Sequence, residues 1–317
     1  MVIDLNSAVE FLRERDNFLI LSHAHPDGDT LGSAFALKYA LEAVGKRAEV
    51  KCCDTVPKKF DYLGKVCDTD YKYGTLVAVD VADTKLLGKD FEELYADKIE
   101  LCIDHHGSNR MFAERTLLDA GAAAACEIIL EIIHALGVKP NKKIADCIYT
   151  GLTTDTGCFR YSNVTPRTMR MAAEMIECEA DNVTINTVMF ETKTRTYAAL
   201  EKLAVAGMKM YLDGKCAVIT VTQEMYRLSG SDESEVDAIA SLPRQIEGVL
   251  VGVTLRERKD GSFKISMRSN RPINVSDICA AMGGGGHPQA AGCQVDGPLE
   301  AATETVVENV KNYIEKL

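Results

Sequence analysis

The chain has 317 residues and a formal net charge of −11 at pH 7, with 46% hydrophobic and 26% charged residues. This composition is ordinary for a globular protein and excludes a mainly disordered chain, and the length predicts two domains. No apolar run approaches the roughly 18 residues that span a bilayer, and the acidic N-terminus lacks a signal-peptide core. We therefore expect a cytoplasmic protein without a membrane partner.

The eleven cysteines include no C-x-x-C spacing, which argues against a zinc ribbon or a thioredoxin-type site. We expect them to be reduced core residues. The acidic charge disfavours a protein that coats long nucleic acid, because such proteins usually present a basic surface. It is compatible with a small nucleotide bound in one local pocket.

Strand and helix patterns alternate at the start of the chain. A short apolar run predicts a strand at residues 18–21, and mostly apolar segments predict strands at residues 48–52, 76–79 and 99–103. Apolar residues at helical spacing predict a helix at residues 31–44. This alternation is typical of βαβ units and of a mostly parallel sheet.

The pattern becomes helical further along, with helices predicted at residues 122–136, 144–152 and 190–210. Strands are predicted again at residues 216–221, 248–253 and 263–267.

We therefore expect an α/β protein of two domains. The first, at residues 1–190, has a mostly parallel β-sheet with flanking helices. A helical linker at residues 191–210 leads to a smaller α/β domain at residues 211–317. The active site is expected in the cleft between the two domains.

Residues of the types that bind metals follow three of the predicted strands. They are His23, His25, Asp27 and Asp29 after the first strand, Asp80 after the third, and Asp104, His105 and His106 after the fourth. Asp155, which follows a predicted helix, is a further candidate. Ligands bind at the carboxyl ends of parallel strands, so these groups are expected to converge on one rim. His134 stands apart on an apolar helix and is interpreted as a packed or solvated side chain.

A mixed set of imidazole and carboxylate ligands suits Mn²⁺ best, with Mg²⁺ or another divalent ion as the alternative. A structural zinc site would be richer in cysteine. Crowded carboxylates repel one another unless cations neutralise them, which favours two ions. A pair roughly 3.5–4 Å apart can activate water and stabilise a phosphoryl displacement.

Other hydrolase motifs fit less well. Asp27-Gly28-Asp29-Thr30 matches the haloacid-dehalogenase pattern, but residues 23–26 separate the strand from its first aspartate. Neither the P-loop motif nor the G-x-S-x-G motif occurs, so a P-loop NTPase and an α/β-hydrolase are not supported.

Together these motifs resemble those of the DHH phosphoesterase superfamily. They occur in the same order as in that superfamily and extend over nearly the whole chain. The matching segments are His23-Ala24-His25-Pro26-Asp27-Gly28-Asp29 with Gly32-Ser33, Asp80, Asp104-His105-His106 with Asn109, Thr154-Asp155-Thr156-Gly157, and Gly283-Gly284-Gly285-Gly286-His287 of the DHH-associated C-terminal domain. Within this superfamily the sequence most resembles the stand-alone nanoRNase and pAp-phosphatase (NrnA-like) type.

The resemblance implies two Mn²⁺ ions. One would be held by His23, Asp27 and Asp80, and the other by Asp29, Asp80, His105 and Asp155, with Asp80 bridging the ions.

The resemblance also implies roles in catalysis and substrate binding. Asp80, Asp104 and His106 would be catalytic: Asp104 fixes an imidazole, His106 lies near the substrate phosphate, and a hydroxide between the metals attacks. The substrate would contact His106, Arg268, Gly285, Gly286 and His287.

Arg268 belongs to a local basic stretch, because residues 254–273, which include Arg271, hold six basic side chains against two acidic ones. An arginine at a strand end can bind a phosphate through two hydrogen bonds. Around Asp260-Gly261 the same basic residues are interpreted as the solvated face of a hairpin.

We therefore predict a Mn²⁺-dependent phosphodiesterase and phosphatase that hydrolyses nanoRNA, pApA or 3′-phosphoadenosine 5′-phosphate (pAp), with a short nucleotide as its partner and no long nucleic acid. The alternatives are a cyclic-di-AMP phosphodiesterase, a RecJ-like single-strand exonuclease and a non-catalytic nucleotide-binding protein. A homodimer is compatible with this interpretation.

Overall fold

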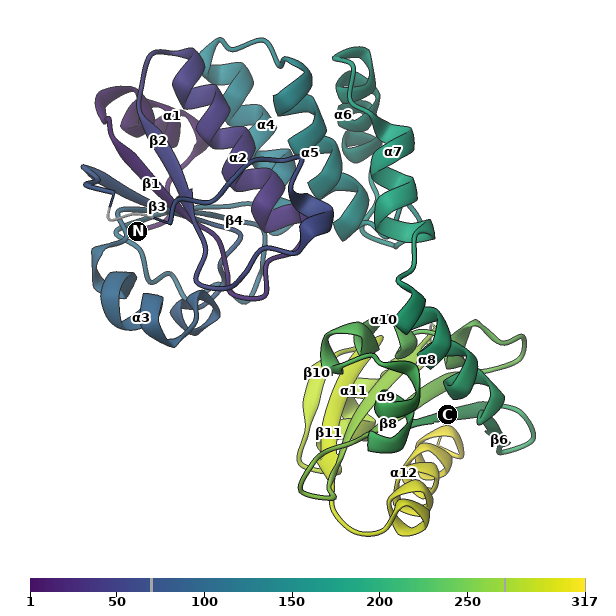
Figure 1. Cartoon of the computed structure of the whole chain (residues 1–317). Coiled ribbons are helices and arrows are strands. Elements are labelled where there is room, and N and C mark those ends of the chain that lie inside the picture. The colour runs from purple at the N-terminus through teal and green to yellow at the C-terminus, as the bar shows by residue number, and fades with distance from the viewer. Residues whose placement is uncertain (69–70, 271, 317) are drawn as a thin grey trace. The chain divides into compact units, whose positions relative to one another are not determined.

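The computed structural model describes residues 1–68, 71–270 and 272–316, so Arg271 of the basic stretch lies outside the described residues. The chain forms two compact units, Met1–Thr192 and Lys193–Leu317 (Figure 1). The α/β architecture predicted from the sequence is confirmed. Within the described part of the chain, no helix is long and apolar enough to cross a membrane.

The first unit is built on a five-stranded sheet in the order β2-β1-β3-β4-β5, and every pair is parallel. The strands are β1 (Phe18–Leu21), β2 (Ala48–Lys51), β3 (Thr75–Val79), β4 (Leu101–Asp104) and β5 (Arg115–Leu118). The strand order reverses between β1 and β3, and such a switch point opens a crevice at the carboxyl ends of the strands. Strand β5 was not predicted, because its four residues include Arg115 and Thr116 and form no apolar run.

Helices cover both faces of this sheet. The helices are α1 (Leu5–Glu14), α2 (Gly28–Ala43), α3 (Lys89–Tyr95), α4 (Ala125–Leu136), α5 (Lys142–Asp155), α6 (Pro166–Glu177) and α7 (Asn182–Asn186). Shorter helical turns are η1 (Lys58–Phe60), η2 (Thr84–Leu87), η3 (Ala96–Lys98) and η4 (Thr187–Glu191). Figure 1 shows α1, α2, α4 and α5 on one side of the sheet and α3 on the other.

Alternating residues of β1 contact the two layers. Phe18 and Ile20 pack into the core beneath α1, α2, α4 and α5, whereas Leu19 and Leu21 pack into the core that includes Tyr95 of α3. Because all four side chains are buried, β1 is an uninterrupted apolar run, as expected for a parallel strand covered on both faces.

Helix α2 begins earlier than its apolar pattern predicts, at Gly28. The Asp27 carboxylate caps it by accepting hydrogen bonds from the backbone N–H groups of Asp29 and Thr30. The first turn of α2 also lies close to α5, since a Cβ atom on Gly151 of α5 would overlap Asp29 of α2 and Cys126 of α4. The close approach brings the end of α5 to the start of α2.

The second unit contains a six-stranded sheet in the order β10-β11-β9-β8-β7-β6, in which only the β7–β8 pair is parallel. The strands are β6 (Lys209–Tyr211), β7 (Cys216–Val221), β8 (Val251–Glu257), β9 (Phe263–Ser269), β10 (Gly285–His287) and β11 (Ala290–Val295). The helical segments are α8 (Arg195–Ala206), α9 (Gln223–Ser229), η5 (Glu233–Glu235), α10 (Val236–Ile239), η6 (Pro243–Gln245), α11 (Val275–Ala280) and α12 (Leu299–Ile314).

Helix α8 lies in the range expected to be a linker, but it is part of the second unit. Its Tyr197 and Leu200 are buried in a cluster with Ile219 and Val221 of β7. The opposite face of the sheet is covered by α11 and α12. Helix α8 is therefore one of the layers of a sandwiched sheet rather than a free connection.

Candidate active site

The candidate site begins where β1, β3 and β4 end. His23 lies two residues beyond β1, Asp80 directly follows β3, and Asp104 is the last residue of β4. Asp80 has a left-handed backbone, with φ of 56°, although its N–H donates to the carbonyl of Ile103 on β4. Such a conformation costs free energy and is typical of residues whose side chain must point in one direction.

The first group of metal-ligand side chains consists of His23, Asp27 and Asp80. The Nε2 atom of His23 lies 3.6 Å from Asp27 Oδ1 and 3.6 Å from Asp80 Oδ2. His25, four residues after β1, does not join this group. Its imidazole is exposed and pairs with Asp54 at 3.0 Å.

The second group consists of Asp29, His105 and Asp155. His105 Nε2 lies 3.8 Å from Asp29 Oδ2 and 3.5 Å from Asp155 Oδ2. It also lies 3.5 Å from Asp80 Oδ1, so Asp80 presents one oxygen to each group. This geometry is that of two adjacent sites that share one carboxylate.

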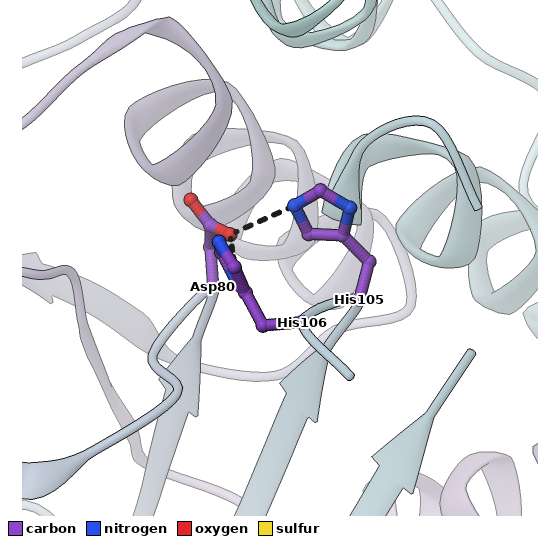
Figure 2. Close-up of side chains that lie close together, drawn as sticks. All are labelled: Asp80, His105 and His106. Carbon is purple, nitrogen blue, oxygen red and sulfur yellow. Dashed lines mark ion pairs between the residues drawn. The ribbon is translucent and has the colours of Figure 1, made fainter. Parts of the chain in front are cut away.

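His106 forms a third group with Asp80 and His105. Figure 2 shows both imidazoles directed toward the Asp80 carboxylate from the end of β4. The Nδ1 atom of His106 is 2.8 Å from Asp104 Oδ1, and the Asn109 amide donates to the other Asp104 oxygen at 2.6 Å. His106 is thereby fixed by a buried carboxylate, while its own side chain is 40% exposed.

Backbone carbonyls orient the other two imidazoles. His23 Nδ1 is 2.7 Å from the carbonyl of Ala24, and His105 Nδ1 is 3.2 Å from the carbonyl of Ala122. When Nδ1 donates to a carbonyl, Nε2 of the neutral ring is an acceptor that faces the carboxylates. This is the arrangement usually found for histidines that bind metals.

The electrostatics of the site suit divalent cations. Burial, and then the charges of neighbouring aspartates, raise the pKa values of Asp80 and Asp155, and burial raises that of Asp29. Asp80 Oδ1 and His105 Nε2 are buried without a hydrogen-bond partner. A cation between them would satisfy both atoms and relieve the repulsion, so the residues fit a metal centre of oxygen and nitrogen ligands.

Asp29 is held by a contact that the sequence did not reveal. Its carboxylate accepts hydrogen bonds from the N–H groups of Ala125 at 2.6 Å and Cys126 at 3.0 Å, at the start of α4. The positive end of the helix dipole also favours a carboxylate there. Backbone donors carry no side-chain signature, so only the alanine-rich segment before α4 could have hinted at a close approach.

Apart from His106, the predicted substrate-binding residues lie in the second unit. Gly285, Gly286 and His287 form β10, which pairs with β11, and the register places His287 and Arg268 on either side of Ala290 in one row. Residues paired in this way project to the same face of a sheet. The Arg268 guanidinium also donates to the carbonyl of Met267 at 3.0 Å.

Glycine at position 286 allows the backbone of β10 to approach the backbone of β11 closely. A Cβ atom on Gly286 would lie 2.6 Å from the carbonyl oxygen of Ala290, and its φ of 149° is rarely adopted by other residues. Gly285 and Gly286 belong to strand β10, whereas Gly283 and Gly284 precede it.

Comparison with known families identifies the class of protein. Residues 17–152 match the DHH family, N-terminal domain, and residues 213–316 match the DHHA1 domain. The chain belongs to the DHH family of phosphoesterases, as the motifs suggested. Enzymes of this class depend on divalent metal ions, and the grouped histidines and aspartates are the candidate ligands here.

One similar protein is the bifunctional oligoribonuclease and PAP phosphatase NrnA of Thermus thermophilus. It is 32% identical over 302 residues, which cover 93% of this chain and 89% of the relative. The NrnA protein of Bacillus subtilis is 24% identical over 88% of this chain and 90% of its own.

Solved structures share the fold. An exopolyphosphatase-related protein from Bacteroides fragilis superposes with a TM-score of 0.88 and 23% identity, covering 98% of this chain and 96% of that one. RecJ from Thermus thermophilus in complex with Mn²⁺ has a TM-score of 0.57 and 16% identity, covering 99% of this chain and 55% of its own.

Proposed function

We propose that this chain is a two-metal phosphoesterase that hydrolyses very short oligoribonucleotides such as pApA, together with pAp. The observation that carries the proposal is that Asp80 lies between two ligand groups, with one carboxylate oxygen 3.6 Å from His23 Nε2 and the other 3.5 Å from His105 Nε2. The similarity to a relative named as an oligoribonuclease and PAP phosphatase supports the choice of substrate.

The proposal assigns His23, Asp27 and Asp80 to one ion, and Asp29, Asp80, His105 and Asp155 to the other. We propose Mn²⁺ as the ion, because the ligands combine imidazole nitrogen with carboxylate oxygen. Two bound ions would neutralise the carboxylates, polarise the phosphoryl group and lower the pKa of water. The protein would hold these metal-ligand side chains at the spacing seen here before the ions bind.

His106 is suited to contact the substrate phosphate. Its hydrogen bond to Asp104 is the main cause that raises its pKa, so the imidazolium persists to higher pH. A partly exposed cation next to the metal ligands can neutralise a phosphate oxygen. Asp104 would act through His106, and Asn109 would act through Asp104.

In the second unit, Arg268 and His287 would bind the distal phosphate or base of the nucleotide. Arg268 and His287 are both paired with Ala290 and project to the same face of the β9–β11–β10 sheet. Gly285 and Gly286 carry no side chains that would cover this face, so a ligand can reach it. Guanidinium groups bind phosphate through two parallel hydrogen bonds.

The test is a substrate panel of pAp, pApA, short RNA, cyclic di-AMP and long single-stranded DNA, incubated with Mn²⁺ and analysed by mass spectrometry. The account predicts AMP from pAp and mononucleotides from the short RNAs, and no turnover by Asp80→Asn. Preferential cleavage of long strands with a steep salt dependence would replace the proposal with a RecJ-like exonuclease. Preferential cleavage of cyclic di-AMP would replace it with a cyclic-dinucleotide phosphodiesterase.

A further inference from the structure

One short segment that leads from β5 into the first turn of α4 contacts two of the proposed metal ligands through its backbone and is linked to a third by Asn163. The carbonyl of Ala122 faces His105 Nδ1, and the N–H groups of Ala125 and Cys126 donate to Asp29. Asn163 bridges the segment to the third ligand, because its amide donates to the carbonyls of Ala123 at 3.1 Å and Asp155 at 3.2 Å.

The segment, residues 122–126, consists of four alanines and a cysteine, all buried. Small side chains allow its backbone to approach the ligands. The same small side chains give it little means of fixing its own position by polar contacts. Packing in the core and the contact of Cys126 Sγ with Ser33 hold the segment in part, and ion pairs at its two ends add a further constraint on its backbone.

Arg167, the second residue of α6, reaches both ends. Its Nη1 donates to Asp119 Oδ2 at 2.6 Å on the side before the segment. Its Nε lies 3.2 Å from Glu127 Oε2 on the side after it, and Nη2 lies 3.0 Å from Glu131 one turn further along α4. One planar guanidinium thus spans the segment.

The ion pair with Glu127 involves a buried carboxylate. The Glu127 side chain is fully buried, and its second oxygen accepts a hydrogen bond from Thr168 Oγ1 at 2.5 Å. A buried carboxylate without a cationic partner is costly, so α4 and α6 cannot separate at this point without a large loss of stability. Asp119 links the other end to β4, since its N–H donates to the carbonyl of Asp104.

We propose that Arg167 is a positioning residue for the metal centre, and that it acts by holding residues 122–126 against His105, Asp29 and Asp155. The inference rests on the proposed two-metal function. Arg167 itself touches none of the proposed ligands in the described contacts; its influence passes through Asp119 and Glu127 to the backbone. Lysine cannot reproduce the contact, because it lacks the planar arrangement of donors.

The test compares Arg167→Met and Arg167→Lys with two controls. Arg170→Met removes an exposed arginine from the same helix, and Glu131→Gln weakens the half-exposed partner of Arg167 that does not adjoin the segment. Each folded variant is titrated with Mn²⁺ by calorimetry, the spectrum of bound Mn²⁺ is recorded by electron paramagnetic resonance, and kcat and KM for pAp are measured.

We expect Arg167→Met to bind Mn²⁺ at least tenfold more weakly, with an altered spectrum and with kcat reduced more than KM is changed. Arg167→Lys should recover part of the affinity, and both controls should match the wild type. A folded Arg167→Met protein with wild-type affinity, spectrum and kcat would overturn the proposal.

If Arg167→Met does not fold, Asp119→Asn decides the question. It removes the charge of a partly exposed partner, retains an acceptor for the N–H of Gly121 and leaves Glu127 paired. A several-fold loss of Mn²⁺ affinity supports the proposal, and unchanged affinity contradicts it. Wild-type protein that binds Mn²⁺ but cleaves no short nucleotide would refute the proposed function alone, whereas wild-type protein that binds no Mn²⁺ would refute both.

Discussion

The two units present their candidate functional groups in opposite ways. In the first unit, Asp29 and Asp80 are almost fully buried, and each imidazole that faces them is oriented by a fixed hydrogen-bond partner. In the second unit, Gly285, Gly286 and His287 lie exposed on the edge strand β10. This difference is the one expected if, as proposed, the first unit is preorganised for chemistry and the second binds different nucleotides.

The largest effect should come from the shared carboxylate of the first unit. Asp80→Asn keeps the size of the side chain and tolerates the left-handed backbone at φ of 56°, but removes the charge from both ligand groups. Hydrolysis of pAp should fall by roughly 1000-fold or more, since both ions would be affected. The metal-free protein should melt no lower than the wild type, because burial already disfavours the charged form of Asp80.

Initial rates with Mn²⁺ and thermal melts without metal check this prediction. Turnover within tenfold of the wild type would show that Asp80 is not essential for hydrolysis. It would also contradict the proposed difference between a catalytic first unit and a ligand-binding second unit.

A smaller effect is expected for Arg268 in the second unit. Arg268→Ala should raise KM for short nucleotides by roughly 10- to 100-fold, the value of a charge-assisted hydrogen bond, with a smaller change in kcat. Arg258→Ala, on the β8–β9 hairpin where the side chain bonds to Gln294, is the matched control. A fall in kcat at unchanged KM would instead place Arg268 in the chemistry and weaken the division between the units.

The pH dependence of metal binding sharpens the description of the first unit. Burial alone would lower the pKa of His23, but the carboxylates of Asp27 and Asp80, each 3.6 Å from its Nε2, raise the pKa to about 11. This shift favours the protonated imidazole in the metal-free protein, so metal binding at His23 should release a proton. Mn²⁺ affinity should rise with pH, by up to about tenfold per unit for each proton released.

Calorimetry between about pH 6 and pH 8, in buffers of different ionisation enthalpy, counts the released protons. Affinity that falls over this range, or binding without proton release, would show that His23 is not a ligand.

The smallest effect is expected for the one histidine outside the predicted motifs. His134 on α4 pairs with Glu174 on α6 at 2.7 Å, and both side chains are more than one-third exposed. His134→Ala should lower the free energy of unfolding by at most about 1 kcal/mol and leave hydrolysis unchanged. Chemical denaturation and a pAp assay test this. Loss of activity would mean that the functional region extends beyond the strand ends.

The sequence predicts much of the first unit because its signals are carried by side chains. Strands β1, β3 and β4 are buried and mostly apolar, and His23, Asp80 and His105 follow them, so parallel pairing alone brings these residues to one rim. Strand β5 escaped prediction because it lies at the sheet edge and carries polar residues.

Other features could not be predicted because they depend on the backbone or on tertiary packing. The N–H groups of Ala125 and Cys126 that hold Asp29 have no residue signature. The contacts of Arg167 join residues about forty positions apart in the chain, so no local pattern marks them. Helix α8 was expected to be a linker because its burial against β7 becomes visible only when the sheet is formed.

The central claim is that the first unit holds two ions that share Asp80. The most direct test counts the Mn²⁺ ions bound per chain, by calorimetry and metal analysis, in the wild type and in Asp80→Asn. The account predicts two ions in the wild type and, in the variant, a marked loss of affinity for both. Two ions bound to Asp80→Asn with wild-type affinity would contradict it.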